Sequence, residues 1–272
     1  MSERAYRIAP TDATTFYPRL IGRHGAVASN SYLSVNAGVD ILKAGGNAID
    51  AAVAATLVEG LVNPQMHTIG GECPILIRLA GESRVISLNG NMAAPMLATP
   101  QAFYSKGLKD VPEEGILAAG VPAAFSALMS ALSRWGTMSF RDVSAHAREL
   151  AANGFAVSAG LRHQHKYGIA YLREKFLAQW PGSATVYLPQ SRVPEVGELM
   201  KNQALARMLE HLAASKDPHA EFYRGDVAGE IARYSKERDG LLSRKDLEAF
   251  ETRIEAPVSL RFGDIEFFKC GF

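Results

Sequence analysis

The segment "HTIGGECPILI", from His67 to Ile77, holds residues whose types and spacing could form part of a binding site. Gly70 and Gly71 admit backbone conformations that other residues resist, and the charged Glu72 stands directly before a strand-like run. Such a loop could line a pocket. A tight turn that needs its glycines only for steric reasons explains the same residues equally well.

Two histidines raise the question of a metal site. His163 and His165 lie two residues apart in "RHQHK", a spacing that directs side chains to different faces of a helix. No carboxylate cluster follows them, and the HExxH motif is absent. We therefore expect solvated helix histidines and no metal site.

A serine nucleophile could be sought in "AVSAG", which has the outline of a nucleophile elbow without its first glycine. The elbow needs a buried strand before the serine, whereas a helical pattern precedes Gly154. Ser158 is therefore expected to be a helix cap or a turn serine.

Composition excludes several classes of protein. The formal net charge of +1 provides no field for nucleic acid or an anionic membrane, so neither partner is predicted. No secretory signal or bilayer-spanning run is seen, which favours a cytoplasmic protein. Cys73 and Cys270 are expected to be free thiols because no Cys/His cluster accompanies them.

The glycine-rich "ILKAGGNAIDAAVAATLVEGL" could be a cofactor loop or a joint between two buried helices. Val35, Val39 and Leu42 recur at helical spacing, and the following Gly45 suits a left-handed helix exit. Asn47 can cap the next helix, with Asp50 three residues later in its first turn. Neither GxxxxGK[ST] nor GxGxxG occurs, so we favour the joint and expect no cofactor.

The remaining pattern predicts a helix-rich α+β protein. Residues 75–79 and 84–88 form a predicted hairpin around the turn "AGES". Helices are expected over 120–135 and 139–154, then in "NQALARMLEHLAAS", "VAGEIARYSKERDG" and "SRKDLEAFE". Residues 159–194 show no clear period, and residues 1–23 read as an extended arm before a body spanning 24–272. The last predicted strands lie in "APVSLRFGDIEFFKC". They leave an unpaired apolar strand edge, so we expect another strand to pair with it.

Several of these segments occur in the order and spacing of the gamma-glutamyltranspeptidase family, which this chain resembles from about His24 to Phe262. The segments are "GAVAS", "AGVDILKAGGNAIDAAVAA", "IGGECPILI", "LNGNMAAP", "GVPAAFSAL", "ELAANGFAVS", "EFYRGDVAGEIA" and "DGLLSRKDLEAFE".

The resemblance implies an N-terminal-nucleophile hydrolase with a four-layer αββα sandwich. In such a protein one precursor cuts itself into a large and a small subunit, which stay together as a heterodimer. The threonine that opens the small subunit attacks an amide of a small-molecule substrate, and its own amine serves as base. This chain aligns with the large subunit, so the nucleophile is expected beyond Phe272 and the chain alone is expected to be inactive. Ser2 is discounted because polar residues follow it.

The chain departs from the family where glutamate binds. The family pattern Asp-Gly-Arg-Glu-x-Ala-Pro is replaced by "NGNMAAP", with Asn89 at the aspartate position and Asn91 at the arginine position. Losing a guanidinium that binds a carboxylate costs about 1.5–3 kcal/mol. Glu72, in place of a glycine of the family's "GGGGF", adds a negative charge. We therefore expect Gly71, Glu72, Asn89 and Asn91 to form a pocket wall for an acyl group without an α-carboxylate, as in acylases or amidohydrolases.

A second function class stays open at this point. The chain could be a non-catalytic remnant or a binding module. The enzyme interpretation predicts a downstream reading frame that opens with threonine at a cleavable junction, whereas a remnant predicts a stop soon after Phe272.

Overall fold

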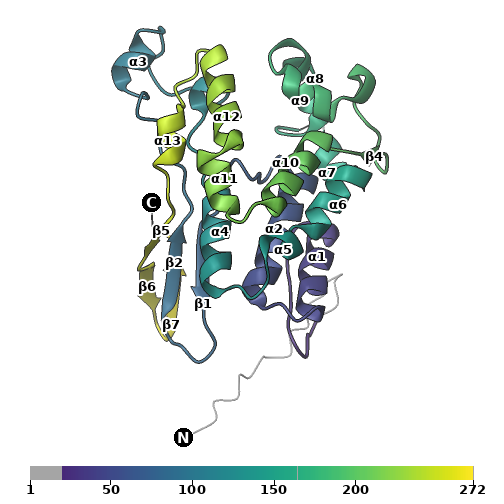
Figure 1. The fold of residues 1–272 in the computed structure, drawn as a ribbon, viewed down its shortest axis with the longest axis vertical. Helices are drawn as coiled ribbons and strands as arrows, with labels where there is room; N and C mark the ends of the chain where they lie inside the picture. Colours follow the sequence, from purple (N-terminus) through teal and green to yellow (C-terminus); the bar gives the residue numbers. More distant parts are fainter. Residues whose placement is uncertain (1–19, 164, 272) are drawn as a thin grey trace, which may run out of the picture.

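The computed structural model describes residues 20–163 and 165–271, and Figure 1 shows their arrangement. Most of the predicted N-terminal arm, Ser2 and Phe272 lie outside the described residues. The elements are α1 (Tyr32–Lys43), α2 (Ala48–Val62), β1 (Ile75–Arg78), β2 (Val85–Asn89), α3 (Pro100–Tyr104), η1 (Ile116–Ala118), α4 (Ala124–Trp135), α5 (Phe140–Val143), α6 (Ala145–Asn153), β3 (Phe155–Ala156), α7 (Ala159–Arg162), α8 (Ile169–Ala178), α9 (Pro181–Tyr187), η2 (Pro189–Ser191), β4 (Leu199–Met200), α10 (Gln203–Ala214), α11 (Pro218–Arg224), α12 (Asp226–Glu237), α13 (Arg244–Glu248), β5 (Arg253–Glu255), β6 (Val258–Phe262) and β7 (Ile265–Lys269).

The joint between α1 and α2 is confirmed. Gly45 has a positive φ of 95°, which takes the chain out of α1. The side chain of Asn47 accepts hydrogen bonds from Ile49 N and Asp50 N, and Asp50 Oδ2 accepts one from Asn47 N at 2.8 Å. This capping box starts α2, which is apolar around most of its circumference and lies inside the helical layer.

The apolar residues whose spacing predicted α1, namely Val35, Val39 and Leu42, are only half-buried. Ser34 Oγ is turned inward, where it donates to Glu59 Oε2 of α2 at 2.6 Å. A Cβ added to Gly38 would lie 3.2 Å from the carbonyl oxygen of Ala51, so the glycine allows α1 to approach α2 closely. The buried residues of α1 are Ser34, Ala37, Gly38 and Ile41.

The main sheet has the strand order β1-β2-β5, with antiparallel pairing throughout. The predicted hairpin is confirmed in the register Ile75↔Leu88 to Arg78↔Val85, and Gly81 supplies the positive φ of its turn. Strand β5 joins the far side of β2 through Asn89↔Arg253. In Figure 1 the helices lie to one side of this sheet. The helix-rich α+β character is confirmed, and the four layers implied by the resemblance are not complete within the described residues.

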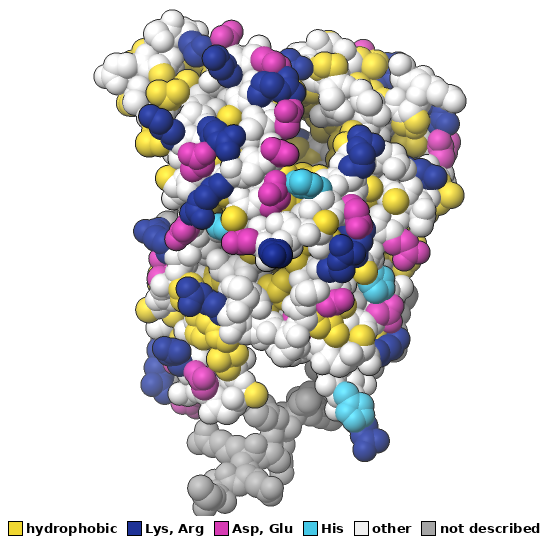
Figure 2. Space-filling model, viewed as in Figure 1, with side chains coloured by type: hydrophobic (Ala, Val, Ile, Leu, Met, Phe, Trp, Pro, Cys, Tyr) yellow, Lys and Arg dark blue, Asp and Glu magenta, His cyan; other side chains and the backbone are white. Residues whose placement is uncertain are grey.

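Strands β6 and β7 form a separate two-stranded sheet whose apolar side chains are exposed. Figure 2 shows hydrophobic side chains at the surface in its lower left, where Figure 1 places these strands. Phe262 is 77% exposed, and Leu260 is 69% exposed. Among residues 20–163 and 165–271, no segment covers the apolar side chains of this hairpin.

The main core lies where α2, α4, α6, α10 and α11 meet, around Phe125, which is fully buried. Its ring packs edge-on against the Phe140 ring, and its ring centroid lies 4.7 Å from that of Phe222. The fully buried Tyr223 donates its hydroxyl to Pro122 O at 2.7 Å. Helix α11 therefore anchors the start of α4.

Helix α11 was not predicted, because its seven residues are too few for a periodic pattern. Asp217 caps it and Pro218 occupies its first turn, a combination that is a recognisable start signal. The predicted helix over 139–154 is divided at Ser144 into α5 and α6, and it ends at Gly154 as expected. None of the described helices is long and apolar enough to cross a bilayer.

Candidate functional site

The candidate site begins where β2 ends. Asn89 is its last residue, and the next residue, Gly90, accepts a hydrogen bond at its carbonyl oxygen from Cys73 N of the neighbouring loop, at 2.9 Å. A Cβ added to Gly90 would lie 2.0 Å from Cys73 O, so only glycine permits this approach. The loop 70–73 and the segment 89–92 are therefore held side by side.

The two asparagines of the predicted pocket wall contact each other. Asn91 Nδ2 donates to Asn89 Oδ1 at 2.9 Å and to Gly271 O at 3.1 Å. Asn89, which is buried, donates from Nδ2 to Glu255 Oε1 at 3.2 Å. Within the described part of the chain, the amide oxygen of Asn91 has no donor. This wall therefore offers a neutral acceptor at Asn91.

Glu72 and Gly71 support the same wall. The exposed Glu72 accepts a hydrogen bond at Oε1 from Met92 N, at 2.8 Å. Gly71 O accepts from Ala123 N at 2.9 Å and from Ala124 N at 2.8 Å, at the start of α4. The structure thus brings all four predicted residues onto two adjacent segments.

The loop before Glu72 borders two hollows. His67 lines a cavity of about 200 Å³ together with Gly70 and residues of α2 and α10. It also lines a groove of about 670 Å³ along α2, which Cys73 and Glu59 share. Burial lowers the pKa of His67, so the neutral imidazole is favoured. Gly70 lines the smaller cavity, whereas Gly71, Glu72, Asn89 and Asn91 line neither hollow, so their role as a pocket wall stays a prediction.

The two cysteines are free thiols, as predicted. Although they are far apart in sequence, they are close enough to interact, because β7 returns to the Cys73 loop. Burial, with the Cys270 thiol as a smaller cause, raises the pKa of Cys73 to about 11. Since the thiolate is the nucleophilic form, Cys73 is not an activated nucleophile.

The structure tests the predictions for Ser158 and for the histidines His163 and His165. Ser158 caps α7 by accepting a hydrogen bond from Leu161 N at 3.0 Å, as predicted. His163 and His165 are exposed, but the prediction that they lie on a helix is wrong. Helix α7 ends at Arg162, and the following turn brings the two rings to a centroid distance of 4.2 Å.

A buried polar network at α4 was missed by sequence reasoning. Ser126 Oγ lies 3.1 Å from His219 Nε2 and accepts from Thr252 N at 3.1 Å and Thr252 Oγ1 at 2.9 Å. Burial lowers the pKa of His219. Ser126 is fully buried, His219 and Thr252 are half-buried, and all three border a hollow of about 670 Å³. Their bonds connect α4, α11 and the residue before β5.

Sequence reasoning also missed Glu255 and Gly271, which accept hydrogen bonds from Asn89 and Asn91. Glu255 reaches Asn89 only because β5 pairs with β2, across 166 positions of sequence. No pattern of neighbouring residues in the sequence predicts a strand pairing over such a distance. Arg253, directly opposite Asn89 in the ladder, brings an exposed guanidinium to this edge.

Known proteins resemble this chain over most of its length. The gamma-glutamyltranspeptidase family model matches residues 34–272. The glutathione hydrolase proenzyme of Escherichia coli (strain K12) is 31% identical over 248 residues, covering 90% of this chain and 41% of the relative. This chain thus spans only about 40% of the length of the curated relatives it matches.

Two solved structures share the fold. Helicobacter pylori gamma-glutamyltranspeptidase superposes with a TM-score of 0.85 at 28% identity, over 93% of this chain and 72% of that chain. The cephalosporin acylase of Bacillus halodurans gives 0.82 at 28% identity, over 96% of this chain and 49% of that chain. The fold is that of the N-terminal-nucleophile hydrolases of this group, and the chain belongs to the gamma-glutamyltranspeptidase family.

Proposed function

We propose that residues 24–272 form the large-subunit portion of a gamma-glutamyltranspeptidase-like amide hydrolase or acyltransferase with altered acyl specificity. The nucleophile is the N-terminal threonine of a separate small subunit, produced by self-cleavage of the same precursor. The two subunits form a heterodimer. The substrate is a small-molecule amide whose acyl part lacks the amino-acid α-carboxylate.

The observation that carries the specificity is the hydrogen bonding of Asn91. Its Nδ2 group is committed to Asn89 Oδ1 and Gly271 O, which leaves the amide oxygen as an acceptor. A substrate carboxylate is itself an acceptor and gains nothing from that oxygen. An N–H or O–H group of a neutral acyl part gains a hydrogen bond.

The charges around Asn91 favour the same choice. Glu72 lies on the adjacent segment, and Glu255 contacts Asn89. A carboxylate brought to this wall meets the like charges of Glu72 and Glu255, and the family's guanidinium is missing from position 91, although Arg253 on β5 brings a cation to the same edge. The likeness to a cephalosporin acylase supports an acyl group of another kind.

The reaction follows from the proposed threonine. Its hydroxyl oxygen attacks the amide carbonyl while its own amine takes the hydroxyl proton, and that proton passes to the substrate nitrogen as the C–N bond breaks and the amine leaves. Water or an acceptor amine then attacks the acyl-enzyme. Asn91, Asn89 and Glu72 in this chain orient the acyl part and take no proton.

The proposal predicts a preference between two anilides with the same leaving group. For the complete protein, kcat/KM on pentanoyl-p-nitroanilide should exceed that on gamma-glutamyl-p-nitroanilide by about tenfold or more, as expected for loss of a charged hydrogen bond and added repulsion. The pentanoyl compound keeps the acyl chain length and lacks the α-amino and α-carboxylate groups. Gamma-glutamyl turnover typical of a transpeptidase would refute the proposal.

A further inference from the structure

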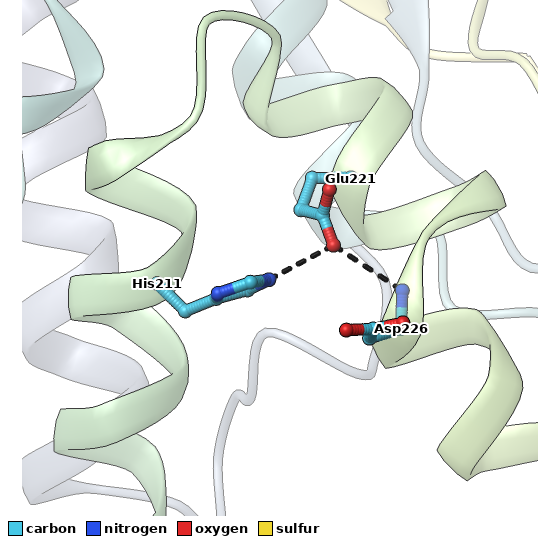
Figure 3. A group of neighbouring side chains, drawn as sticks. All are labelled: His211, Glu221 and Asp226. Atoms are coloured by element: carbon cyan, nitrogen blue, oxygen red, sulfur yellow. Dashed lines mark hydrogen bonds and ion pairs between the residues drawn. The ribbon is translucent and has the colours of Figure 1, made fainter.

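Three side chains with metal-binding atoms converge on the helical face, away from the β2–β5 edge. They are His211 of α10, Glu221 of α11 and Asp226 of α12, and Figure 3 shows them pointing toward one another. One ligand atom from each lies within 4.8 Å of the other two. Three separate helices thus direct one nitrogen and two carboxylate groups to the same point.

The backbone fixes the central carboxylate. Glu221 Oε1 accepts from Asp226 N at 3.2 Å and lies 2.9 Å from His211 Nε2. A Cβ added to Gly225 would lie 2.3 Å from the same oxygen, so the glycine provides the room that this carboxylate occupies.

The bond to Asp226 N and the pairing with His211 explain the positions of Glu221 and His211, but not that of the Asp226 side chain. Among the described residues, the carboxylate of Asp226 has no hydrogen bond or ion pair. The other acidic residues of α12 are different, because Glu230 and Glu237 both pair with Arg233. Figure 2 shows acidic side chains along this face with a histidine beside them. Two carboxylates this close repel each other unless a cation lies between them.

We propose that His211, Glu221 and Asp226 bind a divalent transition-metal ion of the Zn²⁺ class. Imidazole nitrogen with carboxylate oxygen suits Zn²⁺, whereas Mg²⁺ and Ca²⁺ prefer oxygen alone. Water completes a tetrahedral site with these three protein ligands. The ion takes the place of the direct contact between His211 Nε2 and Glu221 Oε1, and the exposed Asp226 carboxylate beside them supplies the third ligand.

The bound ion would tie three helices together at the surface. Helices α10 and α11 follow each other in the chain, and α12 starts directly after Gly225. A ligand from each helix limits their relative movement. This role is independent of the proposed acyl specificity, because none of the three residues contacts the Asn89–Asn91 wall.

The test is calorimetric titration of the chain with ZnCl2 near neutral pH. The unmodified chain should bind one Zn²⁺ at this site, and His211→Ala and Asp226→Asn should each weaken its affinity by about tenfold or more. Asp226→Asn is nearly isosteric and exposed, so the fold is kept. Glu230→Gln, on the same helix but paired with Arg233, is the matched control and should bind as the unmodified chain does.

The cysteine thiols and the pair His163 and His165 are the other groups of this chain that could bind Zn²⁺. Cys270→Ser and the double variant His163→Ala/His165→Ala should keep the binding that His211→Ala loses. Equal affinity in His211→Ala, Asp226→Asn and the unmodified chain would overturn the site, as would no binding at about millimolar Zn²⁺, since a three-ligand site of this kind binds more tightly.

Discussion

Replacing Asp50 with alanine is expected to destabilise the fold by about 3–5 kcal/mol, because several buried donors lose their acceptor together. Asp50 is fully buried and accepts from Asn47 N at 2.8 Å, Thr137 N at 2.9 Å, Thr137 Oγ1 at 2.6 Å and Met138 N at 3.1 Å. It therefore holds the start of α2 and the loop after α4 in one network. Urea denaturation of the two proteins measures the difference.

Asp142→Ala is the matched control for this prediction. Asp142 occupies the same capping-box position in α5, where its Oδ2 accepts from Ser139 N at 3.1 Å, but the pair is exposed. Losing a solvent-exposed cap costs about 0.5–2 kcal/mol. Equal losses in the two variants would show that the contacts of Asp50 with Thr137 and Met138 contribute little.

The contribution of Asp50 should depend on pH. Burial alone would raise its pKa, but the bonds from Thr137, Asn47 and Met138 outweigh it, so the pKa lies below the ordinary value of 3.8. For a lowered carboxyl pKa, the stabilisation is complete above the ordinary value and is lost as the pH falls through the folded-state value. The difference between Asp50→Ala and the unmodified chain should therefore shrink only in strong acid.

Restoring the family's charged pair is expected to create gamma-glutamyl activity. In the complete protein, the double variant Asn89→Asp/Asn91→Arg should raise kcat/KM on gamma-glutamyl-p-nitroanilide by roughly ten- to a hundredfold. A guanidinium at position 91 can bind the substrate α-carboxylate through two parallel hydrogen bonds, and a carboxylate at position 89 can hold it in place. Activity on pentanoyl-p-nitroanilide should not rise in parallel, because its acyl chain carries no carboxylate for the new guanidinium to bind.

Arg253 provides the control for that experiment. It lies opposite Asn89 on β5 and is the guanidinium that the ladder brings to this edge. Arg253→Gln should leave the low gamma-glutamyl activity of the unmodified enzyme unchanged. If this variant instead removes a substantial gamma-glutamyl activity, Arg253 binds the α-carboxylate and the neutral-pocket account is wrong.

Local features of this chain could be predicted from its sequence. The Asn47–Asp50 capping box, the exit at Gly45 and the hairpin around Gly81 each depend on residues a few positions apart. The interactions that stabilise each feature involve only residues close together in the sequence, so the sequence pattern is enough to predict them. Ser158 as a helix cap belongs to the same group.

Features that depend on tertiary pairing could not be predicted. The inward face of α1 is set by Ser34 meeting Glu59, which outweighs the apolar spacing of its valines. The Asn89–Glu255 contact requires β5 to pair with β2, and the approach of Cys270 to Cys73 requires the return of β7. At the site, the residue types indicated a neutral pocket, but the commitment of Asn91 Nδ2 to Gly271 O needed the structure.

The central claim is that this chain supplies a pocket wall and the catalytic group comes from another polypeptide. The described nucleophile candidates agree with it, since Ser126 is fully buried and the raised pKa of Cys73 keeps its thiol neutral. The most direct measurement is anilide turnover by the 272-residue chain alone, beside the complete protein. We predict turnover by the complete protein and none above the buffer rate by the chain. Turnover by the isolated chain would contradict the account.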